Sequence, residues 1–169
     1  MNTQKENKLL KIHLKEDFEF LRKQAPDFDL AVLRDTKRKK EITEAIKKMR
    51  KIMKENNGIG LGANQVGMNW RMFILSDKEK FYAIFNPQII KFSKETEDGE
   101  EGCLSVDGVI GKVSRYKKIV LLGFDKNGKK VKIKAWGILA RAIQHEIDHL
   151  NGILFIDKTK QLYKVANIK

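Results

Sequence analysis

Hydrophobic positions along the chain are spaced first as in a helix and, after residue 58, as in strands. In residues 36–57 the apolar positions recur at intervals of four, three and four, on one face of an amphipathic helix. These positions are Ile42, Ile46, Met49 and Met53. Thr36 is the expected N-cap and Asn57-Gly58 the stop. A face of this kind predicts packing against a core.

The middle of the chain carries short runs rich in β-branched and aromatic residues. They are RMFILS at 71–76, FYAIF at 81–85 and KKIVLLGF at 117–124, and each predicts a strand. In residues 124–135 the turn signal Asn127-Gly128 precedes apolar residues that alternate with lysines, which predicts a hairpin arm with one basic face. The acidic segment SKETEDGEEG at 93–102 is predicted to be a loop that borders Cys103.

A second helix is predicted for WGILARAIQHEIDHLNG, with Gly152 in the C-cap position. Its apolar positions run nearly all round it, which is typical of a buried helix. Polar side chains on a buried helix need partners. This requirement directs attention to the histidines and carboxylates in its second half.

Composition sets broad limits on the kind of protein. With 169 residues, 41% of them hydrophobic, and only two prolines, the chain is expected to form one domain, residues 1–169. One cysteine cannot form an internal disulfide, and the N-terminus has no signal-peptide core, so a cytoplasmic location is expected. No apolar run approaches the roughly 18 to 20 residues that span a bilayer, so no membrane partner is expected.

The net charge of +13 comes from 35 Lys and Arg against 22 Asp and Glu. A ribosome or other nucleic acid would match this charge, and the basic tail KTKQLYKVANIK at 158–169 fits such a partner. The alternative is that the charge serves solubility alone. Because most of the cations are lysines, sequence-specific recognition of nucleic acid is not expected.

The segment RAIQHEIDHLNG holds the strongest chemical signal. His145 and His149 are four residues apart, so both rings project from one face of a helix and can share a metal ion. Glu146 lies between them and can reach the site without being a ligand. Two unpaired imidazoles in a buried helix would be costly, which favours a metal site over satisfied core histidines.

The third ligand is expected upstream, because the zinc-protease position after His149 is Phe155 and no glutamate follows Glu146. The candidate is the only cysteine, Cys103, whose thiolate binds zinc or ferrous iron strongly. Two alternatives are an inert buried thiol and a cysteine nucleophile paired with histidine. A nucleophile would not need two histidines one helical turn apart, so the ligand role is preferred.

Three motifs in order resemble those of a known family. They are GIGLGANQ at 58–65, EGCLS at 101–105 and QHEIDHLNG at 144–152, and NPQI at 86–89 is a weaker fourth match. The first resembles G-x-G-x-A-A-x-Q and the third Q-H-E-x-D-H of the peptide deformylases, which remove the formyl group from the N-terminal methionine of new proteins. The resemblance runs from about residue 40 to Asp157.

The resemblance implies a role for each matching residue. The metal ligands would be Cys103, His145 and His149, and metal-bound water would attack the formyl carbon with Glu146 as general base and acid. Gln65 and the backbone N–H of Leu104 would stabilise the oxyanion. The residues expected to border the substrate and its methionine pocket are Gly58, Ile59, Gly60 and Leu61. Asp148 is expected to pair with Arg115 or with a neighbouring backbone group.

Three positions depart from the family pattern. Gly62 replaces the usual alanine, Asn64 stands where proline is frequent, and Asp107 stands where a proline commonly follows the cysteine motif. The first two predict a looser loop around Gln65. Every proposed ligand and catalytic group is nevertheless present.

Taken together, pattern and resemblance predict an α+β fold with antiparallel sheets packed around a central helix that carries the H-E-x-x-H motif. The resemblance implies one divalent ion, Fe²⁺ as the native metal with Zn²⁺ or Ni²⁺ as substitutes, and N-formylmethionyl nascent peptides as substrates. Two rival functions stay open at this point: a metallopeptidase that cleaves internal peptide bonds, and a ribosome- or RNA-binding protein whose metal site is structural.

Overall fold

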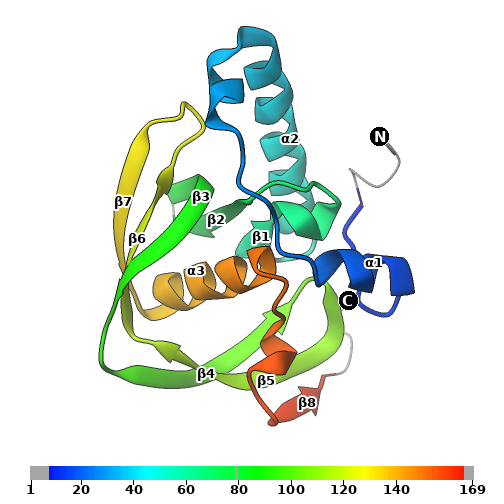
Figure 1. The fold of residues 1–169 in the computed structure, drawn as a ribbon. Coiled ribbons are helices and arrows are strands. Elements are labelled where there is room, and N and C mark those ends of the chain that lie inside the picture. The colour runs from blue at the N-terminus through cyan, green and yellow to red at the C-terminus, as the bar shows by residue number, and fades with distance from the viewer. Residues whose placement is uncertain (1–7, 79, 166–169) are drawn as a thin grey trace.

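Segments with alternating burial form two antiparallel sheets in the computed structural model, which describes residues 8–78 and 80–165 (Figure 1). The larger sheet has the order β1-β2-β3-β6-β7 and the smaller one β4-β5-β8. The strands are β1 Gly60–Gly62, β2 Met72–Asp77, β3 Lys80–Phe92, β4 Thr96–Cys103, β5 Val106–Tyr116, β6 Lys118–Phe124, β7 Lys130–Trp136 and β8 Leu162–Lys164.

In the described residues, three α-helices and three short 3₁₀ helices accompany the two sheets. They are α1 Lys15–Leu21, η1 Leu30–Arg34, α2 Thr36–Glu55, η2 Ala63–Val66, α3 Gly137–Leu150 and η3 Phe155–Asp157. Within residues 8–78 and 80–165, every helix is too short or too polar to cross a lipid bilayer.

Helix α3 lies in the centre of the molecule, with strands of both sheets around it (Figure 1). Its apolar side chains Ala140 and Ile143 join a buried cluster with Phe73 of β2, Leu121 of β6 and Ala135 of β7. The helix carries the H-E-x-x-H motif. The structure therefore confirms the predicted α+β fold with antiparallel sheets around this helix.

The C-terminal turn of α3 ends as predicted. Gly152 has a φ of 73°, a left-handed conformation that glycine adopts without strain. Its N–H donates to the His149 carbonyl at 3.0 Å, and the Ile153 N–H donates to the Asp148 carbonyl at 2.9 Å, the bond pattern of a Schellman motif. This ending fixes the backbone of the turn that carries His149.

Helix α2 confirms the predicted apolar face, because Ile42, Ile46, Met49 and Met53 are all buried. The expected cap was wrong by one residue. Asp35, not Thr36, precedes the helix, and its carboxylate accepts the Arg38 N–H at 2.8 Å. A charged oxygen at this position satisfies an otherwise unpaired backbone donor.

The acidic segment 93–102 was predicted to be a loop, and this prediction was wrong, because residues 96–103 form β4. The strand pairs along its full length with β5, which has Arg115 and Lys112 opposite Glu97 and Glu100. Cross-strand pairs of opposite charge favour a strand whose own residues have low strand propensity. Tertiary pairing therefore outweighs local composition here.

The remaining strand predictions are confirmed, although β3 extends further than residues 81–85. It continues through Pro87 to Phe92, with register shifts against β6 where the proline lies. Such bulges accommodate a residue that lacks a backbone donor. The predicted hairpin joins β6 to β7 through Gly128, whose φ is 74°.

Candidate metal centre and catalytic cleft

One thiol and two imidazoles converge beside the middle of α3. The Sγ of Cys103 lies 3.1 Å from Nε2 of His149, which lies 3.2 Å from Nε2 of His145. All possible ligand atoms of these three residues lie within 4.8 Å of one another. No other group of three or more His, Cys, Asp or Glu residues in the described part of the chain is as close. The structure thus brings together the three residues predicted as ligands.

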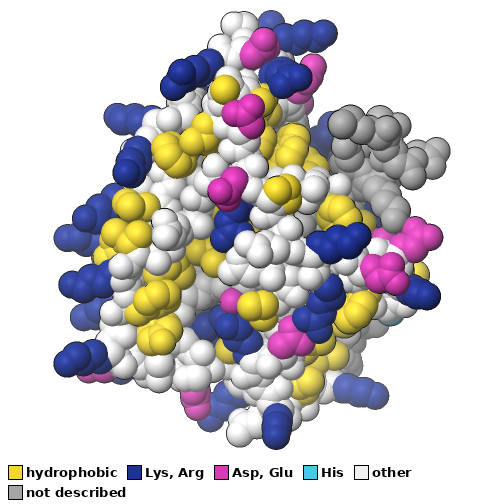
Figure 2. Space-filling view, viewed as in Figure 1, with side chains coloured by type: hydrophobic (Ala, Val, Ile, Leu, Met, Phe, Trp, Pro, Cys, Tyr) yellow, Lys and Arg dark blue, Asp and Glu magenta, His cyan; other side chains and the backbone are white. Residues whose placement is uncertain are grey.

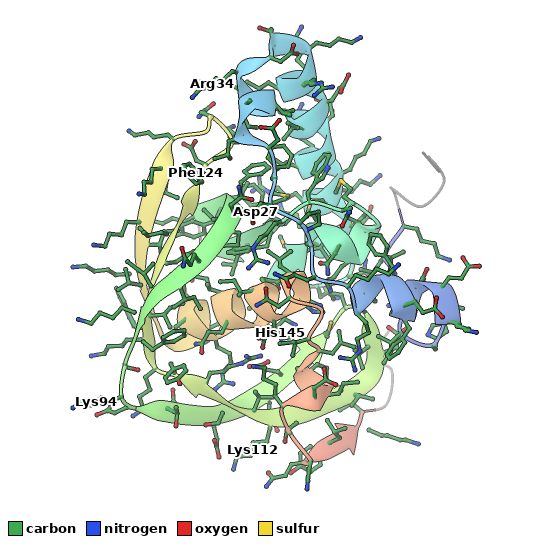
Figure 3. The ribbon with its side chains drawn as sticks, in the orientation of Figure 1. Asp27, Arg34, Lys94, Lys112, Phe124 and His145 are labelled. Atoms are coloured by element: carbon green, nitrogen blue, oxygen red, sulfur yellow. The ribbon has the colours of Figure 1, made fainter. Side chains whose placement is uncertain are left out.

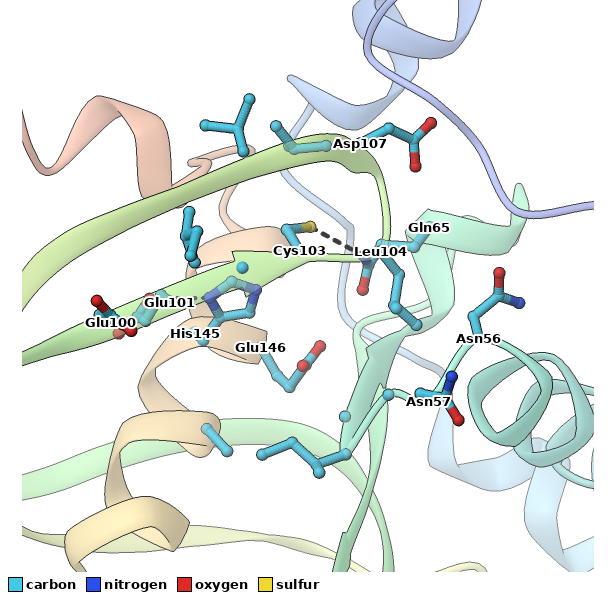
Figure 4. Close-up of a pocket in the computed structure, with 18 of the residues that line it drawn as sticks. Asn56, Asn57, Gln65, Glu100, Glu101, Cys103, Leu104, Asp107, His145 and Glu146 are labelled. Carbon is cyan, nitrogen blue, oxygen red and sulfur yellow. Dashed lines mark hydrogen bonds and ion pairs between the residues drawn. The ribbon is translucent and has the colours of Figure 1, made fainter. Parts of the chain in front are cut away.

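Two elements position these atoms. His145 and His149 lie one turn apart on α3. Cys103 is the last residue of β4 and lies beside His145 (Figure 4). Figure 3 shows His145 in the interior between the two sheets, whereas Lys94 and Lys112 project from the periphery. The ligand set therefore joins the smaller sheet to the central helix.

The protonation of this cluster suits a cation. Burial acts to raise the pKa of Cys103, but the neighbouring His149 and His145 outweigh it and hold that pKa well below the usual value of 9.0. Burial likewise acts to lower the pKa of His145, yet its contacts with Cys103 and Glu101 raise it to about 10. The protein alone therefore favours a thiolate beside an imidazolium, and a divalent cation would replace that proton.

Glu101 holds the outer nitrogen of His145. Its Oε2 accepts the His145 Nδ1–H at 2.9 Å, and Arg115 and Arg141 donate to the same carboxylate at 2.8 to 2.9 Å. A carboxylate in this position fixes the imidazole tautomer and leaves Nε2 free to bind a metal. Glu101 was not among the residues predicted for the site. Its position two residues before Cys103 was the available signal, because residues i and i+2 of a strand share a face.

Asp148 pairs with Arg115, as predicted. Lys158 also approaches this carboxylate, at 3.2 Å. Because Arg115 simultaneously binds Glu101, a buried chain of charges runs from the C-terminal part of α3 through β5 to β4. This chain fixes the orientation of the helix against the smaller sheet.

Glu146 is a buried carboxylate, and its Oε2 has no hydrogen-bond partner among the described residues. Burial raises its pKa from 4.5 to about 7, against the opposing effect of His145 and His149. A group with a pKa near neutrality can both accept and return a proton. Glu146 is thus a buried carboxylate that follows the candidate ligand His145 directly in α3.

Two glycines of the first motif leave room for side chains of this centre. A Cβ on Gly60 would lie 2.3 Å from Oε1 of Glu146, and one on Gly58 would lie 2.6 Å from Cδ1 of Leu104. Both distances are far shorter than a van der Waals contact. These glycines therefore allow β1 and the segment before it to approach the centre closely.

Gln65 is buried on η2, and its side-chain amide points toward the thiol. Its Nε2 lies 3.1 Å from Oγ of Ser105 and 3.6 Å from Sγ of Cys103, while its Oε1 accepts the Gly62 N–H at 2.8 Å. These contacts leave the amide donor facing the metal side of the cleft.

Leu104 lies in the turn between β4 and β5. Its carbonyl accepts Lys11 Nζ at 2.7 Å, and Lys11 also pairs with Asp107 at 2.5 Å. The departure at Asp107 thus provides a carboxylate that anchors Lys11. Among the described residues, no acceptor receives the Leu104 N–H, so this donor is available to a substrate.

The departures at Gly62 and Asn64 form one arrangement. Nδ2 of Asn64 donates to the His149 carbonyl at 2.6 Å. A Cβ on Gly62 would lie only 2.7 Å from Oδ1 of the same asparagine. Glycine at position 62 therefore makes room for an asparagine that joins the Gln65 loop to α3, which opposes the looseness expected from these two changes.

A cleft of about 740 Å³ opens beside this centre and is lined by Gln65, Cys103, Leu104, His145 and Glu146. Gly58, Ile59 and Gly60 form one wall, and residues of the β4–β5 hairpin form the other. Ile59 is 52% exposed, whereas Leu61 is fully buried against α2 and is absent from the cleft lining. Three of the four residues expected to border a substrate thus line the cleft, whereas the side chain of the fourth, Leu61, faces the core.

Comparison with known proteins agrees with the motifs. The sequence profile of the polypeptide deformylase family matches residues 12–165. The chain belongs to the peptide deformylase family. Two bacterial peptide deformylases illustrate the similarity. That of Syntrophomonas wolfei is 43% identical over 69% of this chain and 76% of its own, and that of Carboxydothermus hydrogenoformans is 45% identical over 74% and 84%.

Solved peptide deformylases share the fold. The enzyme from Synechococcus elongatus in complex with actinonin has a TM-score of 0.81 and 32% identity, and covers 94% of this chain and 81% of that one. The Met-Ala-Ser-bound enzyme from Acinetobacter baumannii has a TM-score of 0.80 and 31% identity, with coverage of 89% and 96%. Peptide deformylases are metal-dependent hydrolases, and this protein is an enzyme of that family.

Proposed function

We propose that the whole chain acts as one catalytic domain that removes the formyl group from the N-terminal formylmethionine of nascent peptides and releases formate. The observation that carries the proposal is the buried Glu146 carboxylate, whose Oε2 has no hydrogen-bond partner in the described part of the chain, beside the Cys103, His145 and His149 cluster. Membership of the deformylase family supports the same reaction.

The three ligands fit a divalent ion. One thiolate and two imidazole nitrogens, all within 4.8 Å, leave a coordination position for a small molecule. When bound, the ion supplies Lewis acidity and a hydroxide nucleophile at neutral pH. Soft thiolate and imidazole ligands suit both Fe²⁺ and Zn²⁺, and family resemblance favours Fe²⁺ as the native ion, with Zn²⁺ or Ni²⁺ as substitutes.

In this proposal Glu146 moves the proton. Its carboxylate accepts a proton from the attacking water and delivers it to the amine of methionine as the C–N bond of the formamide breaks, so formate and a free N-terminus result. Burial raises the pKa of this carboxylate, which favours the accepted proton staying on Glu146 until the amine takes it.

Gln65 and Leu104 would stabilise the oxygen that becomes negative during attack. The Gln65 amide is held by Gly62 and Ser105, and the Leu104 peptide is held by Lys11. Donors that are positioned before the reaction cost no reorganisation when charge develops. Losing one such donor typically lowers the rate about 100- to 1000-fold.

The substrate would lie along β1. This strand is at the edge of the larger sheet, and its first residue, Gly60, lines the cleft together with Gly58 and Ile59, which precede the strand. An extended peptide can add to such an edge by backbone hydrogen bonds. The bound Met-Ala-Ser in the Acinetobacter baumannii relative supports a short peptide that begins with methionine.

Formate release is the deciding test. Anaerobically purified protein is expected to release formate from formyl-Met-Ala-Ser and to leave a longer unformylated peptide intact. Cleavage of the longer peptide would instead indicate a metallopeptidase. Glu146→Ala is expected to lose activity and keep its metal, Cys103→Ser to lose both, and the exposed control Glu19→Ala to keep both. Retained activity in Glu146→Ala would contradict the proposal.

We also propose a cytoplasmic enzyme that associates with ribosomes, on the grounds of the net charge of +13. The basic tail at 158–169 is one candidate contact, although its last four residues lie outside the described part of the chain. Co-sedimentation with ribosomes should weaken as salt rises. Salt-independent association, or none, would contradict it.

A further inference from the structure

The strands β3, β6 and β7 carry only one sign of charge. Their sequences contain six lysines and no aspartate or glutamate: Lys80, Lys91, Lys118, Lys130, Lys132 and Lys134. All six are exposed, and within residues 8–78 and 80–165 none forms an ion pair with a carboxylate. Figure 2 shows a column of Lys and Arg side chains along the edge of the molecule that β7 occupies.

Strand register places most of these lysines on one face. Lys91 of β3 and Lys134 of β7 lie on either side of Val120 of β6, and Lys118 lies opposite Trp136. Side chains at paired positions share a face of the sheet. Because Ala135 and its neighbours on β6 pack toward α3, the lysines project from the opposite face.

This face is hollowed at one end. A groove of about 650 Å³ runs between Lys91 and Phe92 on one side and Lys134 and Trp136 on the other, with the backbone of β6 beneath. Trp136 is 69% exposed. The groove therefore combines ammonium groups on both sides with an uncovered indole ring.

We propose that this groove, called the basic groove below, binds single-stranded RNA. Lys134 lines the groove, and Lys132 and Lys130 continue from it at every second residue of β7, so the three can contact successive phosphates. The exposed indole can stack on a base. The absence of carboxylates on the three strands removes repulsion along the path. Lysine contacts to phosphates predict weak dependence on base sequence.

Anionic lipid is the other polyanion to consider, and the shape argues against it. A bilayer surface buries apolar side chains that project outward, whereas Val120 lies between two lysines at the bottom of a hollow. A flexible single strand can enter such a hollow. The geometry therefore favours RNA.

Residues that line the basic groove and the catalytic cleft are close neighbours in the sequence. Trp136 ends β7 and lines the groove, while Ile138 at the start of α3 lines the cleft. RNA held in the groove would place the cleft mouth near that RNA. The inference does not depend on the hydrolytic proposal, because RNA binding and formate release from a free peptide are separate measurements.

The test measures binding of a short fluorescein-labelled oligouridylate to the full chain by anisotropy over a range of salt. Replacement of Lys130, Lys132 and Lys134 by Gln is expected to weaken binding about 10-fold or more at low salt and to reduce the slope of log Kd against log salt by about 2. Formate release from free formyl-Met-Ala-Ser should remain unchanged, which shows that the variant is folded.

A matched control removes the same charge elsewhere. Lys37, Lys40 and Lys54 are exposed on α2 and have no carboxylate partner among the described residues. Their replacement by Gln is expected to change oligouridylate binding less than about threefold, because only distant charge is lost. Equal losses in the two triple variants would overturn the proposal.

Trp136 provides a second, charge-independent readout. Trp136→Ala is expected to weaken binding about 10-fold, whereas Trp136→Phe should retain most of it, because a phenyl ring still stacks. Tyr163→Ala, a change at a 51% exposed aromatic on β8, is the control and should have no effect. Tighter binding to phosphatidylglycerol vesicles than to oligouridylate, or unchanged binding in Trp136→Ala, would refute the proposal.

Discussion

At the scale of single residues, the arrangement of the candidate metal centre depends on glycines, which have no side chain, as well as on the polar side chains that meet there. Gly60 is the clearest case, because its lack of a side chain lets β1 lie against the Glu146 carboxylate. The grouping of Cys103, His145 and His149 was predictable from residue type and spacing. The need for glycine here was not, because it arises from a contact between positions 86 residues apart in the chain.

Gly60→Ala tests this point. The new Cβ would lie 2.3 Å from Oε1 of Glu146 and would displace the carboxylate, so kcat/KM for formyl-Met-Ala-Ser should fall about 100-fold. The control Gly102→Ala meets its nearest atoms only at 3.8 Å and should keep nearly full activity. Equal activity of the two variants in a formate assay would show that Glu146 tolerates the displacement.

At the scale of elements, η2 and α3 are joined by one side chain. Asn64 donates to the carbonyl of His149, and Gly62 leaves space for it. Gly62→Ala should therefore destabilise the protein by about 1 to 3 kcal/mol through overpacking. The same change in an Asn64→Ala background should cost less, because the obstructing oxygen is gone.

A double-mutant cycle measured by urea unfolding gives this coupling directly. We expect a non-additive energy of at least about 0.5 kcal/mol between positions 62 and 64. Pairing Gly62→Ala with the distant Asn127→Ala provides an additive reference. Additivity between positions 62 and 64 would mean that the two departures from the family pattern arose independently.

Elements were predictable where local pattern and tertiary packing agree. The apolar face of α2 and the β6–β7 hairpin have a strong period or turn signal, and the apolar residues all round α3 mark a buried helix. The structure has all three elements in place. The acidic strand β4 was missed, because its stability comes from the partner strand β5 and from Arg115 and Arg141. Pairings of this kind are not visible in local composition.

The candidate site followed the same rule. The i, i+4 spacing of His145 and His149 indicated a shared ion, and the single cysteine was the remaining soft ligand. Glu101 was missed because its role in the site depends on a hydrogen bond with a histidine 44 positions later in the chain. Lys11, which holds the Leu104 carbonyl from 93 positions away, was missed for the same reason.

At the scale of the whole molecule, Glu101 links the smaller sheet to α3 and makes the free energy of unfolding depend on pH in the acidic range. Burial acts to raise its pKa, but hydrogen bonds from Arg115 and His145 outweigh burial and lower the pKa from 4.5 to about 2. A lowered carboxyl pKa stabilises the fold above the unfolded value of 4.5. That contribution is lost as pH falls toward 2.

Metal-free protein should therefore lose about 3 kcal/mol of unfolding free energy from this group between pH 5 and about 2. Glu101→Gln should be less stable at neutral pH by about 3 to 5 kcal/mol, because it leaves Arg115 short of a partner, and its acid dependence should be flatter. Urea unfolding at several pH values measures both effects. The exposed Glu19→Gln is the control, and an unchanged acid slope in Glu101→Gln would contradict the assignment.

Strand β1 has only three residues and one unpaired side. If the proposed function is correct, so short a strand can form backbone hydrogen bonds only with the first residues of a nascent peptide and cannot recognise the residues that follow. Deformylation would then depend little on the sequence after the first residues, which suits an enzyme that acts on many different newly made proteins. The brevity of that edge also gives stray strands little to pair with, which protects the open cleft from self-association.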